Sequence, residues 1–293
     1  MKRFLVILIL ACSVGSFAQE QPGPDLPKTS PAQPAQQPSS GPDAAAPKKP
    51  AADIADQNLR KAKDLISHAI TALGGPAYLN IRDREFQGRT FGFHHGRSSG
   101  NGVLFWGFSQ FPDKERDELT PQRDVSELYV GNKGWEITYK GAHPLEEKDL
   151  ADYLRRRRFS LDTLLRTWVN DPSVVLIYDG NATAAQHPAL QVTLINAQNE
   201  SVTIDFDADT YLPVKKSFEW RDPVDRQKNL EEEVYENYRF VAGTMAPYNI
   251  TRFFNGDMAS ERFLFNVTIN QGLDQAMFDP NSGYNPIKAQ GKH

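Results

Sequence analysis

The sequence predicts an α+β fold in which a curved antiparallel sheet carries helices on its concave face. Short segments with alternating apolar and polar residues follow one another over residues 86–267, separated by turn residues. A single helical block interrupts them at residues 146–170. Ten or more such strands exceed what a flat open sheet tolerates, so we expect the sheet to curl and its concave face to bury the apolar sides of the helices.

An export signal opens the chain. Lys2 and Arg3 precede a short apolar run, and Ser16-Phe17-Ala18 is a small-x-small cleavage site, which predicts a signal peptide over residues 1–18. The apolar run is too short for a permanent membrane helix. The alternative is lipidation of Cys12, because residues 9–12 resemble a bacterial lipobox, although Leu10 fits that motif poorly. The predicted location is therefore periplasmic or exported, or membrane-anchored through Cys12.

Residues 19–52 differ in composition from the rest of the chain. They are rich in Pro, Ala and Gln and contain no aromatic residue, so they cannot bury enough apolar surface to offset the entropy of ordering. We predict a disordered tether here, one folded domain over residues 53–280 and a flexible tail over residues 281–293. Because Cys12 is the only cysteine, the folded part has no disulfide, thiol nucleophile or cysteine metal ligand.

Two helical regions are expected. The first begins at Asp53, a candidate cap, and ends before Gly74-Gly75-Pro76. Its apolar residues recur at spacings of three and four: Ala62, Leu65, Ile66, Ala69, Ile70 and Leu73. The second region, residues 146–170, is expected to break into two helices at Ser160, which can cap the second of them.

The strands form two groups. Those expected before the helical block cover residues 84–94, 102–110, 114–120, 125–131 and 135–139. Those expected after it cover residues 174–178, 190–196, 201–207, 212–220, 232–241, 248–255 and 260–269. Residues 131–134, Gly-Asn-Lys-Gly, form the sharpest hairpin signal. The charged run from Lys114 to Leu119 is expected to be a strand with one or both faces exposed to solvent. The alternative is an edge strand whose charges prevent pairing with another chain.

Charge limits the range of partners. The chain has a net charge of −4 and is not suited to nucleic acid. Its one basic cluster, Arg155 to Arg158, fans around a predicted helix and cannot form a flat stripe. We expect a solvated surface in which these arginines pair with nearby acids, namely Glu146, Glu147, Asp149 and Asp152. The alternative is contact with anionic lipid headgroups or an acidic partner.

No catalytic constellation is evident. The sequence contains no Gly-x-Ser-x-Gly, phosphate loop or Rossmann fingerprint. His94 and His95 would point to opposite faces of a strand, and Asp205, Asp207 and Asp209 lack the glycine and closing glutamate of a calcium loop. The prediction is a non-enzymatic protein with no cofactor and no metal, and an unrecognised hydrolase is the least favoured alternative.

The order of elements resembles the periplasmic lipoprotein-carrier superfamily, the LolA/LolB/LppX-like half-barrels. The resemblance covers about residues 53–280 and is carried by the helix ending in Leu73-Gly74-Gly75, the hairpin of residues 128–135, and the passages at residues 204–214 and 238–247. It implies an incomplete β-barrel whose hydrophobic cavity, closed by helices, holds acyl chains of lipoproteins or other lipids.

Large side chains on the strands are the candidates for lining such a cavity, because acyl chains need a concave apolar surface. The candidates are Phe91, Phe93, Leu104, Trp106, Phe108, Trp135, Ile137, Tyr139, Phe263 and Phe265. Ordinary core packing is the competing interpretation for each of them. Val103 and Phe105 on the opposite face of one strand indicate that both faces are covered there, and the phase of the alternation does not distinguish the cavity face.

The function favoured by these observations is binding of a lipid or a lipoprotein acyl chain, as a carrier or sensor in the cell envelope. The alternative is a structural or interaction module of the envelope whose half-barrel is filled by its own helices. The expected partners are a lipid or acyl chain and, as a second candidate, an envelope protein, with no nucleic acid.

Overall fold

One antiparallel sheet of 14 strands dominates the structure, a computed structural model that describes residues 51–286. The predicted signal peptide, Cys12, nearly all of the predicted tether and residues 287–293 lie outside the described residues. The strands are β1 (Asp83–His94), β2 (Arg97–Ser98), β3 (Val103–Gln110), β4 (Lys114–Leu119), β5 (Val125–Val130), β6 (Lys133–Thr138), β7 (Gly141–Pro144), β8 (Val175–Ala184), β9 (His187–Ile195), β10 (Ser201–Asp207), β11 (Pro213–Arg221), β12 (Lys228–Val241), β13 (Thr244–Phe254) and β14 (Asp257–Ile269).

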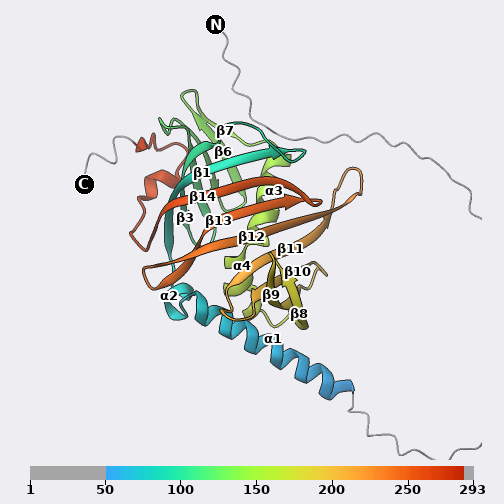
Figure 1. Ribbon diagram of the computed structural model, residues 1–293. Helices are drawn as coiled ribbons and strands as arrows, with labels where there is room; N and C mark the ends of the chain where they lie inside the picture. The colour runs from blue at the N-terminus through green and yellow to red at the C-terminus, as the bar shows by residue number, and fades with distance from the viewer. Residues whose placement is uncertain (1–50, 287–293) are drawn as a thin grey trace, which may run out of the picture. The chain divides into compact units, whose positions relative to one another are not determined.

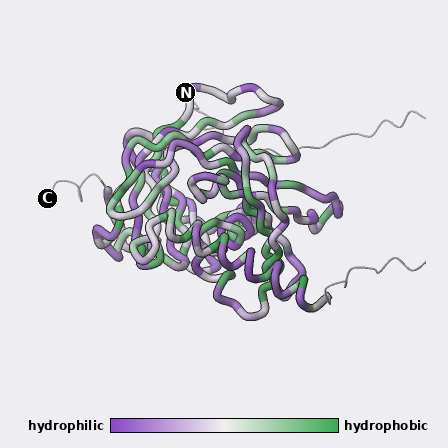
Figure 2. The backbone as a smooth tube through the Cα atoms, turned by 60° about the horizontal axis from the view of Figure 1, so that its bottom comes forward, coloured by the Kyte–Doolittle hydropathy of each residue, from purple (hydrophilic) through white to green (hydrophobic). Residues whose placement is uncertain are grey.

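The sheet consists of two meanders joined at one seam. Its order runs β7-β6-β5-β4-β3-β1-β14-β13-β12-β11-β10-β9-β8, and β2 pairs with β1 outside this path. The seam is the pairing of β1 with β14, which sets Arg84 opposite Ile269 and Thr90 opposite Arg262. The sheet curls without closing, and hydrophobic and hydrophilic residues alternate along its strands (Figures 1 and 2).

The helices are α1 (Ala51–Leu73), α2 (Pro76–Leu79), α3 (Glu147–Arg158) and α4 (Leu161–Arg166), with short 3₁₀ turns η1 (Trp168–Asn170) and η2 (Gln275–Phe278). The predominantly helical segment from α3 to η1 lies on the concave face of the sheet, whereas α1 contacts β8 and β13 (Figure 1). The predicted α+β fold, a curved half-barrel with helices on its concave face, is therefore confirmed. No helix between residues 51 and 286 combines the length and apolar character needed to cross a bilayer.

The helix boundaries follow local chemistry. Helix α1 extends to Ala51, so Asp53 lies inside its first turn, where its charge favours the helix dipole, and does not cap it as predicted. Gly74 ends the helix at φ +123°, and a Cβ there would lie 2.5 Å from the carbonyl oxygen of Gly243. Ser160 caps α4 as predicted, because its hydroxyl accepts the backbone N–H of Thr163 at 3.2 Å.

The main core lies between the helices and the second meander. Leu164 and Leu165 of α4 are fully buried, and Phe159 packs its ring 4.4 Å from that of Phe218 and 5.8 Å from that of Trp168. The apolar side of α1 belongs to the same cluster. The interior of the β8 to β11 half of the sheet is thus occupied by side chains of the protein itself.

Strand β4 contradicts the expectation of a wet strand or a sheet edge. It lies inside the sheet between β3 and β5, and Arg116, Asp117 and Glu118 are buried. Glu118 accepts hydrogen bonds from Nε of Arg116 at 2.7 Å and Nε of Arg123 at 2.6 Å. The charges are tolerated because both faces of the strand supply partners.

The segment after β14 covers the outer face of the first meander, the face opposite the helices. Met277 and Phe278 of η2 are buried against Phe108 and Leu128. Arg116 also donates to the carbonyl oxygen of Met277 at 3.2 Å. Tyr284, within the predicted tail, packs against the same cluster. Strands β3 to β6 are therefore covered on both faces.

Candidate ligand-binding cavity

Two adjoining cavities lie between the concave face of the sheet and the helices. One has a volume of about 210 Å³ and a mainly apolar lining, and the other has a volume of about 680 Å³ and is lined largely by charged and tyrosine side chains. We name them the apolar chamber and the polar chamber. They share a wall formed by Arg84, Phe86, Ser160, Asp162, Glu233, Tyr235, Ile250 and Arg262.

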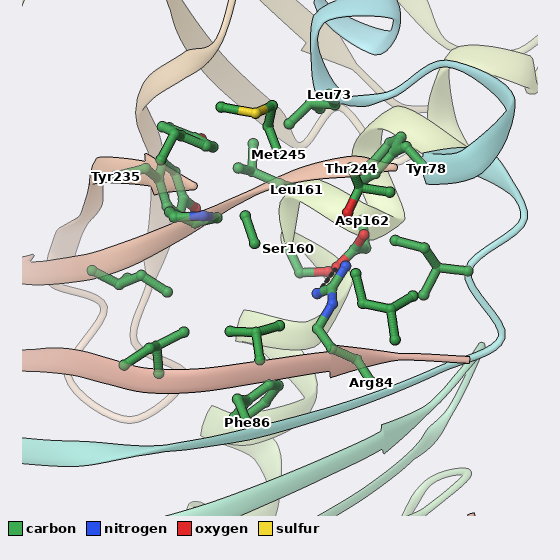
Figure 3. A pocket seen from close by; sticks show the side chains of 18 of the residues that line it. Leu73, Tyr78, Arg84, Phe86, Ser160, Leu161, Asp162, Tyr235, Thr244 and Met245 are labelled. Atoms are coloured by element: carbon green, nitrogen blue, oxygen red, sulfur yellow. Dashed lines mark hydrogen bonds and ion pairs between the residues drawn. The ribbon is translucent and has the colours of Figure 1, made fainter. Parts of the chain in front are cut away.

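Strands β1, β13 and β14 supply most of the apolar chamber (Figure 3). Phe86 points inward and pairs across the strands with Gly107 of β3, where a Cβ would overlap the Phe86 ring. A glycine at position 107 therefore makes room for that ring. The other apolar lining residues are Leu73, Ile81, Phe105, Leu161, Met245, Ala246, Pro247, Ile250, Leu264, Val267 and Ile269.

A small polar group marks the boundary between the chambers. Nη1 of Arg84 lies 3.1 Å from Oδ2 of Asp162, an ion pair drawn in Figure 3. Burial raises the pKa of the neighbouring Tyr78, and the charge of Asp162 raises it further. Nε of Arg84 and Oδ1 of Asp162 are buried and make no hydrogen bond with any residue between 51 and 286. These two atoms are available to a polar group of a ligand.

One wall of the polar chamber is acidic. The hydroxyl of Tyr153 in α3 donates to Glu115 at 2.8 Å, and that of Tyr129 donates to Glu127 at 2.9 Å. The two tyrosine rings stack at 3.5 Å, which fixes α3 over β5. Burial, reinforced by the charge of Asp117, raises the pKa of Glu115 to about 7, and burial also raises the pKa values of Asp117 and Glu127. Burial therefore makes the ionised forms of these carboxyls less favourable than they are in water.

Arg252 and Glu233 line another part of the polar chamber. Lys216, which is 1% exposed and lies outside the lining, is 2.8 Å from Glu233. Burial alone would raise the pKa of Glu233, but Lys216 and then Arg252 lower it to about 2. Arg252 forms longer ion pairs, at 3.4 Å with Glu231 and at 3.8 Å with Glu233. Lys216 and Arg252 therefore hold Glu233 ionised.

Three of the four arginines of α3 depart from the solvated surface that we predicted, and Arg158, whose side chain is 49% exposed, conforms to it. Arg155 pairs with Glu231 at 3.1 Å, and its guanidinium lies 3.4 Å from the ring centre of Trp220. Arg156 and Arg157 line the polar chamber, and Arg158 pairs with Glu200 at 3.1 Å. Of the four predicted acidic partners, Asp152 forms an ion pair, with Arg155 at 2.8 Å. Because α3 lies on the concave face, Arg155 reaches Glu231 of β12 and Arg158 reaches Glu200 in the turn before β10.

None of the ten sequence-predicted lining residues contributes to either chamber. Leu104, Trp106 and Phe108 alternate with inward-facing Phe105 and Gly107, so they lie on the outer face. Trp106, Phe108, Trp135 and Ile137 pack with the segment after β14.

The remaining predicted lining residues lie at the rim of the sheet or on its surface. Phe91 packs against Phe263 at 6.0 Å between ring centres, and Phe93 lies in β1 opposite Ser98. Tyr139 is 90% exposed and Phe265 is 54% exposed. A role in ligand binding for these ten residues stays a prediction.

Sequence reasoning missed the residues of both chambers. The available signal was the charged run in β4, because its alternation places Glu115 and Asp117 on one face and Arg116 and Glu118 on the other. In the described part of the chain, no group of three His, Cys, Asp or Glu residues is placed to hold a metal ion.

Solved structures share this fold at low sequence identity. A DUF1329 family protein from Desulfovibrio piger matches with a TM-score of 0.54 and 11% identity over 76% of this chain and 97% of that chain. A putative outer membrane lipoprotein-sorting protein domain from Vibrio parahaemolyticus matches with a TM-score of 0.51 and 12% identity over 78% and 98%. A LolA superfamily protein from Nitrosomonas europaea gives a TM-score of 0.48 and 14% identity over 74% and 97%.

These matches concern the fold alone, because the identities are so low. No protein-family model and no curated protein sequence matches the chain. The resemblance to the lipoprotein-carrier superfamily, predicted from the order of elements, is confirmed at the level of the fold.

Proposed function

We propose, from the half-barrel fold and its two-part cavity, that this protein binds an amphiphile such as a lipid or a lipoprotein acyl chain. The observation that carries the proposal is the junction of an apolar chamber with a larger polar one inside the same half-barrel. Burial of each methylene group in the apolar chamber contributes about 0.8 kcal/mol. The polar chamber has the size of ordinary small-molecule sites. An amphiphile matches this division, with its chain in one chamber and its headgroup in the other.

The role proposed is binding without chemical conversion, as a carrier or sensor in the cell envelope. The predicted signal peptide supports export, and Cys12 supports the alternative of a membrane anchor. The hydrogen bonds of the buried carboxyls also support binding over chemical conversion. Glu115 and Glu127 each accept a hydrogen bond from a tyrosine hydroxyl of the protein itself.

The self-filled alternative draws support from the other half of the fold. Phe159, Leu164, Leu165 and Trp168 occupy the interior beside β8 to β11 and are between 0 and 8% exposed. Ligand binding is therefore proposed for the β1, β13 and β14 side alone.

Native mass spectrometry of the protein purified from envelope fractions, followed by lipid extraction, tests the proposal. We expect a lipid in stoichiometric amount. Ile250→Trp places a large ring in the wall between the chambers and should abolish the lipid-bound mass. The matched control is Val175→Trp, at a 56% exposed position on the edge strand β8. A clean unliganded mass for the wild type, or retention of lipid by a folded Ile250→Trp variant, would contradict the proposal.

A further inference from the structure

Arg156 has no ion-pair partner in the part of the chain that the structure describes. It lies in α3, is half-buried and lines the polar chamber. The other arginines of the run are engaged: Arg155 with Glu231, Arg158 with Glu200, and Arg157 with the carbonyl oxygen of Asp113 at 3.2 Å. Between residues 51 and 286, no hydrogen bond or ion pair joins Arg156 to another residue.

Two further arginines reach the same chamber from the sheet. Arg262 of β14 pairs across the strands with Ile250, and Arg252 lies two residues beyond Ile250 on β13, so both arginines share the inward face. Burial lowers the pKa of Arg252, and the charge of Arg156 lowers it further. Arg156 and Arg252 both line the polar chamber, where the charge of Arg156 acts on the Arg252 guanidinium.

Several carboxylates near these cations are shared between partners. Glu231 and Glu233 form ion pairs with Arg155, Lys216 and Arg252, and the ion pairs of Arg252 are the longest of these. On the acidic wall, Glu127 lies within electrostatic reach of Arg156, but it accepts the Tyr129 hydroxyl and burial raises its pKa. Arg262 lies 3.5 Å from Asp117. Among the arginines that line the polar chamber, Arg156 is therefore the one that makes neither an ion pair nor a hydrogen bond with a residue between 51 and 286.

We infer that Arg156 and Arg252 form an anion-binding subsite for a phosphate group. Guanidinium groups bind phosphate through paired N–H donors, and an arginine without a protein partner loses no ion pair when the anion arrives. The inference rests on the proposed function and extends it, because it assigns an anionic class to the ligand's headgroup. The chambers share the wall at Glu233, Ile250 and Arg262, so phosphate and acyl chain would occupy one continuous site.

Isothermal titration calorimetry with three probes tests this subsite: a lysophosphatidylglycerol, a monoacylglycerol with the same acyl chain, and inorganic phosphate, with the lipids below their critical micelle concentrations. We expect Arg156→Gln to weaken lysophosphatidylglycerol binding by about tenfold or more and to leave monoacylglycerol binding unchanged. The control is Arg158→Gln, which makes the same charge change on the same helix at a residue outside both chambers and should alter Kd by less than about twofold.

The probes also separate the sources of the phosphate. Binding of inorganic phosphate that Arg156→Gln abolishes supports the subsite with free phosphate as a ligand. Binding of lysophosphatidylglycerol without binding of inorganic phosphate supports the subsite with the lipid headgroup as its ligand.

Other outcomes overturn the inference. Equal affinity of the wild type for the charged and neutral lipids, or equal effects of Arg156→Gln and Arg158→Gln, removes the anion subsite and leaves lipid binding intact. Failure of both lipids to bind contradicts the proposed function itself.

Discussion

Replacement of Glu118 by Gln should destabilise the fold more than any other single charge removal at an ion pair of β4. Glu118 is fully buried on the outer face, where Arg116 and Arg123 both donate to it. Glutamine has nearly the same volume, so the change leaves no cavity. It removes the charge that compensates two buried guanidinium groups, and one of its terminal atoms becomes a donor that faces an arginine donor.

The magnitude follows from the burial of the three side chains, which are between 0 and 6% exposed. Breaking a buried ion pair by removal of one partner costs about 3–5 kcal/mol in free energy of unfolding. For a domain of this size each kcal/mol lowers Tm by roughly 2–4 °C, so about 3 kcal/mol corresponds to a fall in Tm of roughly 6–12 °C. The packing of η2 should loosen as well, because Arg116 also donates to Met277.

Urea denaturation followed by tryptophan fluorescence, together with a thermal melt, measures this loss. Glu219→Gln is the matched control, since Glu219 pairs with Lys228 while both side chains are about half exposed, and such pairs contribute about 0–1 kcal/mol. If Glu118→Gln were no more destabilising than Glu219→Gln, the buried arrangement around Glu118 would be refuted.

Two further predictions concern the concave face. The folded-state pKa of Glu115 is raised from 4.5 to about 7, so the folded state binds more protons than the unfolded state. The contribution of Glu115 to stability is therefore complete below about pH 4.5 and is lost as the pH rises to about 7. Glu115→Gln should remove up to about 3 kcal/mol of this pH dependence in urea titrations, and an unchanged profile would contradict the raised pKa. Gly107→Ala should push the Phe86 ring into the apolar chamber, which should lower the free energy of unfolding by about 1–3 kcal/mol and reduce the lipid extracted per protein. The control is Gly92→Ala, where a Cβ meets no atom closer than 3.8 Å, and it should change neither quantity. Equal effects of the two variants would contradict the apolar chamber as the lipid site.

The sequence was sufficient to predict the architecture, but it was insufficient to predict which face of the sheet carries the cavity. Features that depend on neighbouring residues can be predicted from the sequence. They include the hairpin after Val130, the cap at Ser160 and the helix ending at Leu73. The orientation of Trp106 depends on what covers each face of β3. Helices cover one face and the segment after β14 covers the other, and both require large apolar side chains.

The charged residues illustrate the same limit. The run in β4 and the arginines of α3 look solvent-exposed when each is considered alone, because charged side chains are rarely buried without partners. Their partners come from distant parts of the chain: Arg155 reaches Glu231, and Asp117 reaches Arg262. Only the curl of the sheet brings these residues together.

The seam between β1 and β14 also bears on the order of events in folding. It joins residues near the start of the described chain to residues near its end, as in the pairing of Arg84 with Ile269. Contacts so distant in sequence form slowly, since a very long loop must close before they contribute stability. The first meander cannot gain its neighbour across the seam, or its outer cover, until the last strand has been synthesised. The seam and the outer cover therefore form only when the whole described chain is present.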